Sequence, residues 1–251
     1  MPTDFNSISI KIAFEASLGW TAEQDPYTVS LGRLYPDIEI EALGRTGRYL
    51  FKIEKAVPHH GEAMIRSVAA EAEAEIQAFW NVLAYLRDDT IVRPVGRVYY
   101  EHEGQLREVA PRRERSSGAT IATGTGRPWF EAHADAFHRQ YNHDLMKRFN
   151  FARGLADPVN RFLSLYSMLS SVSGDNQSKI DEAIRCEEAT VAVSPSPRDG
   201  RPETIFTRLR NELAHHREGV SVYRTHEEIG LHVDRFEWLV GRILRPRIEL
   251  T

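Results

Sequence analysis

Cysteine is nearly absent from this 251-residue chain, which contains Cys186 and no other. A single cysteine cannot form a disulfide within the chain and cannot supply a Cys-rich zinc site. Its scarcity is typical of proteins from a reducing compartment. No stretch approaches 18 uninterrupted apolar residues, and the first residues lack the basic-then-apolar pattern of a signal peptide. We therefore expect a soluble, cytoplasmic protein with no membrane partner.

The chain also lacks an excess of positive charge, because 32 Lys and Arg residues stand against 36 Asp and Glu residues, a formal net charge of −4. This balance excludes a global electrostatic attraction to nucleic acid, although it leaves room for a local basic patch. The hydrophobic fraction of 41% is ordinary for a globular protein, and the length suits one large domain or two small ones.

The first 53 residues contain the alternation of polar and apolar side chains that is typical of half-buried strands. The pattern covers residues 7–12, 38–43 and 49–53, with a hairpin loop predicted at 44–47. Since one face of each strand is polar, we expect an antiparallel sheet that is covered on one side.

A helix over residues 62–87 is the predicted cover, because good helix formers dominate it and its apolar residues recur at helical spacing. Two strand-like pieces, 91–100 and 105–109, follow. We therefore predict a small α+β domain of unknown role over residues 1–110. It contains no phosphate loop, metal-ligand cluster or nucleophile motif, and we interpret His59-His60 as a solvated loop. No cofactor-binding or metal-binding residue is predicted in the chain.

Residues 111–128 are rich in charge, Ser, Thr and Gly and have no periodicity, which predicts a linker or mobile loop. Arg112, Arg113 and Arg115 offer contacts to a phosphate backbone, but a solvated linker is the simpler interpretation.

From residue 129 the apolar periodicity is helical and predicts a bundle of about five helices over 129–251. The expected helices cover residues 129–149, 158–173, 176–185, 203–217 and 226–244. Asp157, Asp175 and Thr225 are the predicted N-caps, and residues 194–200 form an extended loop. On the second helix a stripe of small polar residues suits either a partner helix or a solvated face: Asn160, Ser164, Ser167 and Ser171.

The helix over 203–217 carries the one constellation with a recognisable chemical capability, Arg210, Asn211 and His215. An apolar stripe directs one side of this helix to the bundle core: Ile205, Phe206, Leu209 and Leu213. At about 100° per residue, Arg210, Asn211 and His215 lie together on the opposite side with Thr207 and Ala214, so we expect them to face outward. Asn211 and His215 are one turn apart, and a hydrogen bond between them would fix the imidazole tautomer.

These three residues suit metal-independent cleavage of RNA. His215 is the candidate general base or acid, and Arg210 is the candidate to stabilise the charged phosphorane. Because one histidine cannot easily perform both proton transfers, we expect a second copy from a symmetry-related chain, and hence a homodimer formed through the bundle.

The segment TRLRNELAHHREG, set in a helical bundle, resembles the Arg-Asn-x-x-x-His signature of the HEPN superfamily (higher eukaryotes and prokaryotes nucleotide-binding). Arg210, Asn211 and His215 match the motif positions. The resemblance implies a dimeric, metal-independent ribonuclease with its active site at the dimer interface, as in toxin–antitoxin, anti-phage and RNA-processing systems. It also implies RNA and a protein partner or antitoxin as binding partners. It covers residues 129–245 and does not extend to 1–110.

Two other interpretations stay open. The combination RFLSLYSMLSSVSGDNQ followed by TRLRNELAHHR is similar to bacterial proteins labelled methylamine-utilisation MauJ-like. That similarity implies a non-catalytic dimerisation or nucleotide-binding module of a metabolic operon. In a third interpretation the N-terminal domain performs the function and the bundle holds an oligomer together.

Overall fold

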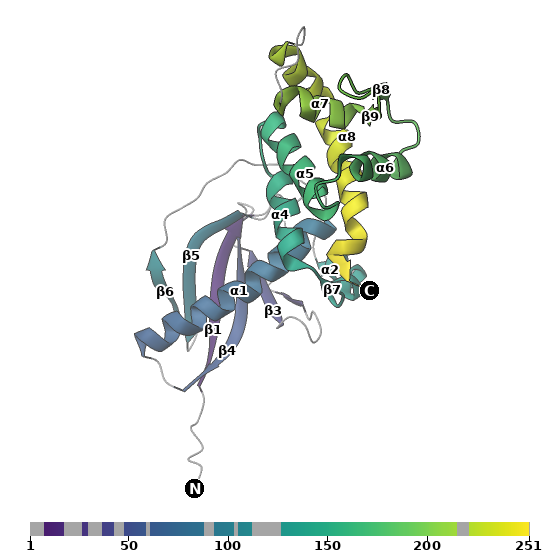
Figure 1. The fold of residues 1–251 in the computed structure, drawn as a ribbon. Coiled ribbons are helices and arrows are strands. Elements are labelled where there is room, and N and C mark those ends of the chain that lie inside the picture. The colour runs from purple at the N-terminus through teal and green to yellow at the C-terminus, as the bar shows by residue number, and fades with distance from the viewer. Residues whose placement is uncertain are drawn as a thin grey trace. The chain divides into compact units, whose positions relative to one another are not determined.

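The computed structural model describes residues 8–17, 27–29, 37–42, 48–58, 61–87, 93–102, 105–111, 127–214 and 221–250. The chain divides into two compact units, Met1–Arg139 and Gln140–Thr251. The first unit combines an antiparallel sheet with helices, and the second is mainly helical (Figure 1). The chain is therefore α+β, as its sequence predicts.

The sheet of the first unit has six strands in the order β2-β3-β4-β1-β5-β6, and every neighbouring pair is antiparallel. The strands are β1 (Ile8–Ser17), β2 (Tyr27–Val29), β3 (Ile38–Ala42), β4 (Arg48–Val57), β5 (Arg93–His102) and β6 (Gln105–Pro111). The central strands β1 and β4 pair along their whole length, with Phe14 opposite Phe51. The sequence thus indicates β1, β3, β4, β5 and β6 correctly, whereas β2 is not among the predicted strands.

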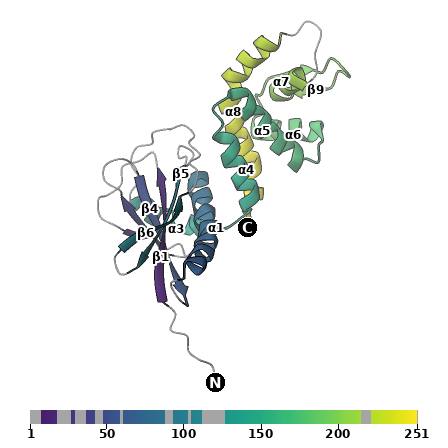
Figure 2. The same ribbon diagram turned by 90° about the vertical axis from the view of Figure 1, so that its left-hand side faces the viewer.

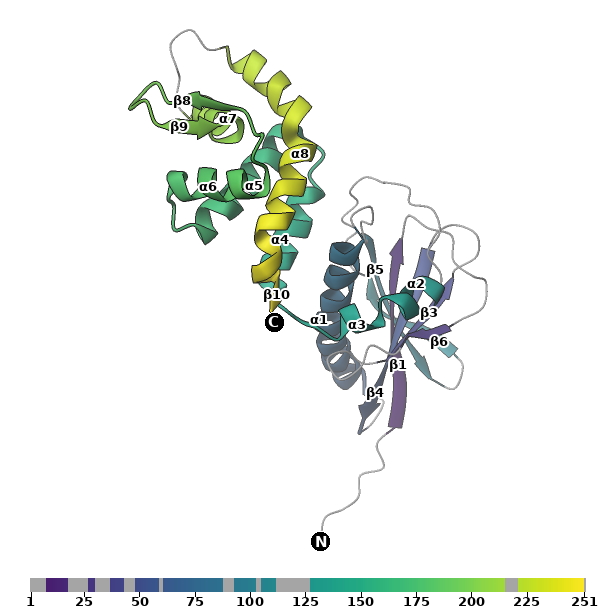
Figure 3. The same ribbon diagram turned by 90° about the vertical axis from the view of Figure 1, so that its right-hand side faces the viewer.

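Helix α1 (Glu62–Leu86) lies along one face of this sheet, as the views in Figures 2 and 3 show. The Phe51 ring centre is 6.1 Å from that of Phe79 and 5.6 Å from that of Trp80. All three side chains are buried, and each such aromatic contributes roughly 1.5–3 kcal/mol to stability. The predicted covering helix is thus confirmed.

Strand β4 also carries Lys52, whose neighbours Phe51 and Ile53 point to the apolar face, and this lysine has three carboxylate partners. Its Nζ lies 2.7 Å from carboxylate oxygens of Glu41 and Glu101 and 3.4 Å from Glu39. Burial opposes the charged ammonium, but the hydrogen bonds to Glu101 and Glu41 outweigh it and raise the pKa of Lys52. Burial likewise opposes the charged form of Glu39, but Lys11 and Lys52 together lower the pKa of that carboxyl.

Two short helices, α2 (Arg127–Ala132) and α3 (Ala134–Phe137), belong to the first unit. Phe130 and Phe137 stack on Phe79, with ring centres 6.3 and 5.5 Å away. This differs from the sequence prediction, which places residues 129–149 in one helix of the bundle. The chain instead leaves α3, becomes extended at β7 (Gln140–Tyr141) and begins α4 only at His143. Residues 112–126, most of the predicted linker, lie outside the described residues.

The described part of the second unit contains five helices and two small strand pairs. The helices are α4 (His143–Arg153), α5 (Pro158–Val172), α6 (Gln177–Glu187), α7 (Ile205–Ala214) and α8 (Val222–Ile248). Strand β7 pairs with β10 (Glu249–Leu250), and β8 (Val193–Pro195) pairs with β9 (Pro202–Thr204) as a hairpin. At the core, the Phe236 ring centre lies 4.9 Å from that of Phe162 and 4.6 Å from that of Phe206.

One of the three predicted helix caps is confirmed. Asp157 accepts a hydrogen bond from a backbone N–H in the first turn of α5. At α6 the capping residue is Asn176, because Asp175 adopts a left-handed conformation with φ of 54° in the preceding turn. Helix α8 begins after Ser221, so Thr225 lies inside the helix, where its buried hydroxyl donates to a glutamate of α7.

Candidate functional site

A buried aspartate fixes the junction between the β8–β9 hairpin and α7. Oδ1 of Asp181, on α6, accepts hydrogen bonds from the backbone N–H of Thr204 at 2.9 Å and from its hydroxyl at 2.7 Å. The Thr204 Oγ1 accepts in turn from the backbone N–H of Thr207 at 3.4 Å, so Thr204 caps the first turn of α7. Asp181 therefore ties α6, the hairpin and α7 to one another.

Asn211 lies at the centre of a polar network on α7. Its Nδ2 donates to Glu203 Oε2 at 3.0 Å and to Gln177 Oε1 at 3.4 Å, and its Oδ1 accepts from Arg210 Nη1 at 3.1 Å. A carboxylate only accepts and a guanidinium only donates, so these partners fix which way the amide is turned. Asn211 thus connects the carboxyl group of Glu203 to the guanidinium of Arg210 and orients that guanidinium.

The expectation that this whole side of α7 faces outward does not hold. Thr207 is fully buried and Asn211 is 8% exposed, whereas Arg210 is half-buried and Ala214 is exposed. The reason is that the β8–β9 hairpin packs against α7, and that Glu203 of β9 and Gln177 of α6 bind the Asn211 amide. Of the predicted trio, the structure brings Arg210 and Asn211 together. His215 lies outside the described residues, and its hydrogen bond to Asn211 stays a prediction.

The aromatic ring of Tyr166 lies next to the guanidinium of Arg210. The Arg210 Cζ is 5.8 Å from the ring centre of Tyr166, and the Tyr166 hydroxyl is 3.1 Å from Thr207 Oγ1. Burial raises the pKa of Tyr166 to about 12, against a smaller opposing effect of the bond to Thr207. The phenol therefore stays protonated near neutral pH and contributes a π-face to the cation rather than a base.

Arg210 and Asn211 line a pocket of about 590 Å³. Its other lining residues come from the start of α6 and from the tip of the hairpin: Gln177, Ser196, Pro197, Arg198, Asp199 and Arg201. This volume lies within the range of pockets that hold small ligands.

The described residues that line the pocket carry three guanidinium groups and one carboxylate. The carboxylate of Asp199 accepts from Arg201 Nε at 2.8 Å and from Nη2 at 2.5 Å, and these bonds lower the pKa of Asp199 to about 2. Among the described residues, neither Arg198 nor Arg210 has a carboxylate partner. The pocket is therefore locally cationic in a chain of net negative charge, and its chemistry suits an anion.

Four contributors to this site are absent from the sequence prediction: Tyr166, Gln177, Arg198 and Glu203. Tyr166 reads as a core residue of its helix, and Glu203 lies at the expected start of the motif helix, with no sign that it would bond to Asn211. The available signal is the gathering of Arg198, Asp199 and Arg201 in a loop, which is compatible with an ordinary solvated turn.

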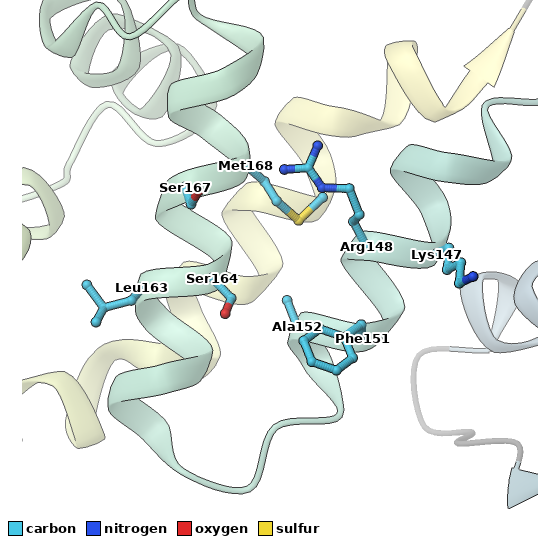
Figure 4. A pocket seen from close by; sticks show the side chains of 8 residues that line it. All are labelled: Lys147, Arg148, Phe151, Ala152, Leu163, Ser164, Ser167 and Met168. Carbon is cyan, nitrogen blue, oxygen red and sulfur yellow. The ribbon is translucent and has the colours of Figure 1, made fainter.

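A second hollow, of about 500 Å³, lies between α4 and α5 (Figure 4). It is lined by Lys147, Arg148, Phe151, Ala152, Leu163, Ser164, Ser167 and Met168. Ser164 and Ser167 belong to the small polar stripe, and Phe151 at the rim is 68% exposed. Part of that stripe therefore borders a surface groove with an apolar rim.

In the described ranges, no three or more His, Cys, Asp or Glu side chains gather as a metal site would require. None of the helices in these ranges has the length and apolar character needed to cross a membrane.

Comparisons with protein-family models, with curated proteins and with solved structures found no match to this chain.

Proposed function

We propose that the second unit is a HEPN-like helical domain that acts, as a dimer, as a metal-independent endoribonuclease. One observation supports this most directly: Arg210, oriented by Asn211 and backed by Tyr166, borders a cationic pocket of ligand size. The five described helices and the Arg-Asn-x-x-x-His spacing accord with the proposal.

The proposed reaction is an internal transesterification. The ribose 2′-oxygen attacks the adjacent phosphorus, the bond from phosphorus to the 5′-oxygen breaks, and a 2′,3′-cyclic phosphate and a 5′-hydroxyl result. His215 accepts the proton of the 2′-hydroxyl, and His215 of a second copy donates a proton to the leaving oxygen. Arg210 stabilises the charge that grows on the non-bridging oxygens. The products account for every atom of the substrate, so no co-reactant is consumed.

Cleavage of labelled single-stranded RNA in the presence of EDTA tests this proposal. We expect His215→Ala to lower the single-turnover rate about 10²–10⁴-fold and Arg210→Ala about 10²-fold or more, while the protein sediments as a dimer. Arg245→Ala is the matched control, because this exposed arginine in the last turn of α8 is not among the described residues that line the pocket. Equal rates in wild type, Arg210→Ala and His215→Ala, or loss of all cleavage on chelation, would contradict the proposal. A role in phage defence or stress response predicts expression toxicity that His215→Ala relieves.

The volume of the pocket favours a second candidate, a non-catalytic nucleotide-binding module. This candidate predicts that a mononucleotide saturates the protein in calorimetry, that Arg210→Ala weakens it, and that RNA stays intact at any protein concentration.

A further inference from the structure

The tip of the β8–β9 hairpin is a turn that backbone hydrogen bonds close. Ser196 N–H donates to the carbonyl of Arg201 at 2.7 Å, and Gly200 N–H donates to the carbonyl of Ser196 at 2.8 Å. Gly200 adopts φ of +69°, which strains any residue with a Cβ. The side chain of Asp199 further binds both the backbone N–H and the guanidinium of Arg201. These bonds therefore fix the backbone from which the side chains of the turn project.

The two arginines of this turn differ in their partners. Arg201 is engaged by Asp199, whereas the guanidinium of Arg198 has no hydrogen-bond partner among the described residues. Arg198 and Arg210 both line the pocket, one from the hairpin and the other from α7. Two cations that have no carboxylate partner in the part of the chain that the structure describes, supplied by separate elements, suit an anion with more than one charged group.

We propose that the turn over residues 196–201 is a phosphate clamp for single-stranded RNA. Arg210 binds one phosphate, Arg198 binds a neighbouring phosphate of the same strand, and Asp199 limits the affinity by neutralising Arg201. The ligand is a single strand because a concave pocket takes nucleotides that are not held in a stacked duplex. The inference rests on the proposed function for its choice of RNA as the polyanion, and it assigns Arg198 and Asp199 to substrate affinity rather than to the chemical step.

The test is binding of a 2′-O-methyl RNA oligonucleotide, which lacks the attacking hydroxyl and cannot be cleaved, measured over a series of salt concentrations. A single-stranded contact contributes about 0.7 to the slope of log K against log salt concentration. We expect Arg198→Ala to weaken binding about tenfold and to make the slope shallower by about 0.7. Arg245→Ala should leave both unchanged.

Asp199→Asn gives the decisive second arm, because it removes the carboxylate of Asp199 from the pocket and keeps a similar shape. The clamp predicts tighter binding, on the order of fivefold, and a steeper slope as the charge of Arg201 is released. If Asp199 only held the turn in shape, Asp199→Asn would weaken binding of the oligonucleotide instead of tightening it. Weaker binding of Asp199→Asn, or an unchanged slope in Arg198→Ala, overturns the proposal.

The source of the phosphate is tested by competition with a nucleoside monophosphate and with inorganic phosphate. We expect neither to displace the oligonucleotide at concentrations far above its own. If either binds as tightly as the oligonucleotide, with the same dependence on Arg198, the site is one for small phosphates and the clamp is overturned. Binding that depends on Arg198 without any cleavage of natural RNA would remove the catalytic proposal and keep the clamp. Normal RNA binding and cleavage by Arg198→Ala would do the reverse.

Discussion

Replacing Asp181 by alanine tests whether the α6–hairpin–α7 junction depends on one side chain. The backbone N–H and the hydroxyl of Thr204 both donate to Asp181, and Thr204 is fully buried. Each buried donor left without a partner costs about 1–3 kcal/mol. We therefore expect Asp181→Ala to lower the free energy of local unfolding at this junction by roughly 3 kcal/mol. Asp181→Asn keeps an acceptor oxygen and should cost only about 1 kcal/mol.

Hydrogen exchange of the α7 amides, followed by mass spectrometry, measures this locally, because global unfolding of a chain with two units is not two-state. Glu182→Ala is the control, since Glu182 is the exposed neighbour of Asp181 on α6 and its removal should stay within about 0.5 kcal/mol. Thr204→Val should cost less in the Asp181→Ala background than alone, because the hydroxyl then has no bond to Asp181 left to lose, whereas the cap of α7 is lost in both backgrounds. Additive costs, or equal protection in Asp181→Ala and Glu182→Ala, would refute the reasoning.

Two further predictions concern packing and charge. Gly230 has open space around its missing Cβ, so Gly230→Ala should stabilise α8 by about 0.5–1 kcal/mol through helix propensity. A Cβ on Gly241 would lie 3.1 Å from the ring of Phe149, which is buried and has little room to shift, so Gly241→Ala should instead cost about 1–3 kcal/mol. Protection of the α8 amides against hydrogen exchange that ranks the pair the other way would contradict this. In the first unit, Lys52→Met should lose on the order of 2 kcal/mol at pH 7, because three carboxylates then lose their shared cation. The pKa of Glu39 is lowered below 4.5, so its stabilisation is present above that pH and is lost as the pH falls through the lower, folded value. The pKa of Lys52 is raised above 10.5, so its stabilisation is complete below that pH and is lost as the pH rises through the higher, folded value. Hydrogen exchange of the β4 amides at several pH values, corrected for the intrinsic exchange rate at each pH, should therefore show the stability gap between wild type and Lys52→Met narrowing towards pH 4. A gap that does not change between pH 7 and 4 would count against this account.

The elements with strong periodicity were predictable from the sequence. Alternation locates β1, β3 and β4, and the apolar spacing of residues 62–87 locates α1, because each pattern is set by burial of one face of a single element. The break between α3 and α4 was not predictable in this way. Residues 129–149 keep a helical pattern, but Phe130 and Phe137 are buried against Phe79 of the first unit, and the chain pairs as a strand at Gln140.

The candidate site shows the same division. The sequence places Arg210 and Asn211 on one side of a helix, and the structure has them in contact. A helical wheel describes one helix and its own residues, so it could not show that Glu203 and Gln177 would bury Asn211. The β8–β9 hairpin has only three residues in each strand, and Pro195 and Pro202 flank its turn, so its strands are too short to show a period. No periodic pattern therefore indicated that Arg198, at the tip of this hairpin, would line a pocket.

The pairing of β7 with β10 has a consequence for how the second unit can be rearranged. Its opening residues Gln140 and Tyr141 face its closing residues Leu250 and Glu249, and Asn142 N–H donates to the carbonyl of Ile248 at 2.8 Å. The two ends of the unit are thus adjacent, so a short peptide can join them and new ends can be opened between α4 and α5 without removing a helix. We therefore expect the unit to tolerate circular permutation, or insertion into a surface loop of a host protein, because the host's chain ends then stay close together.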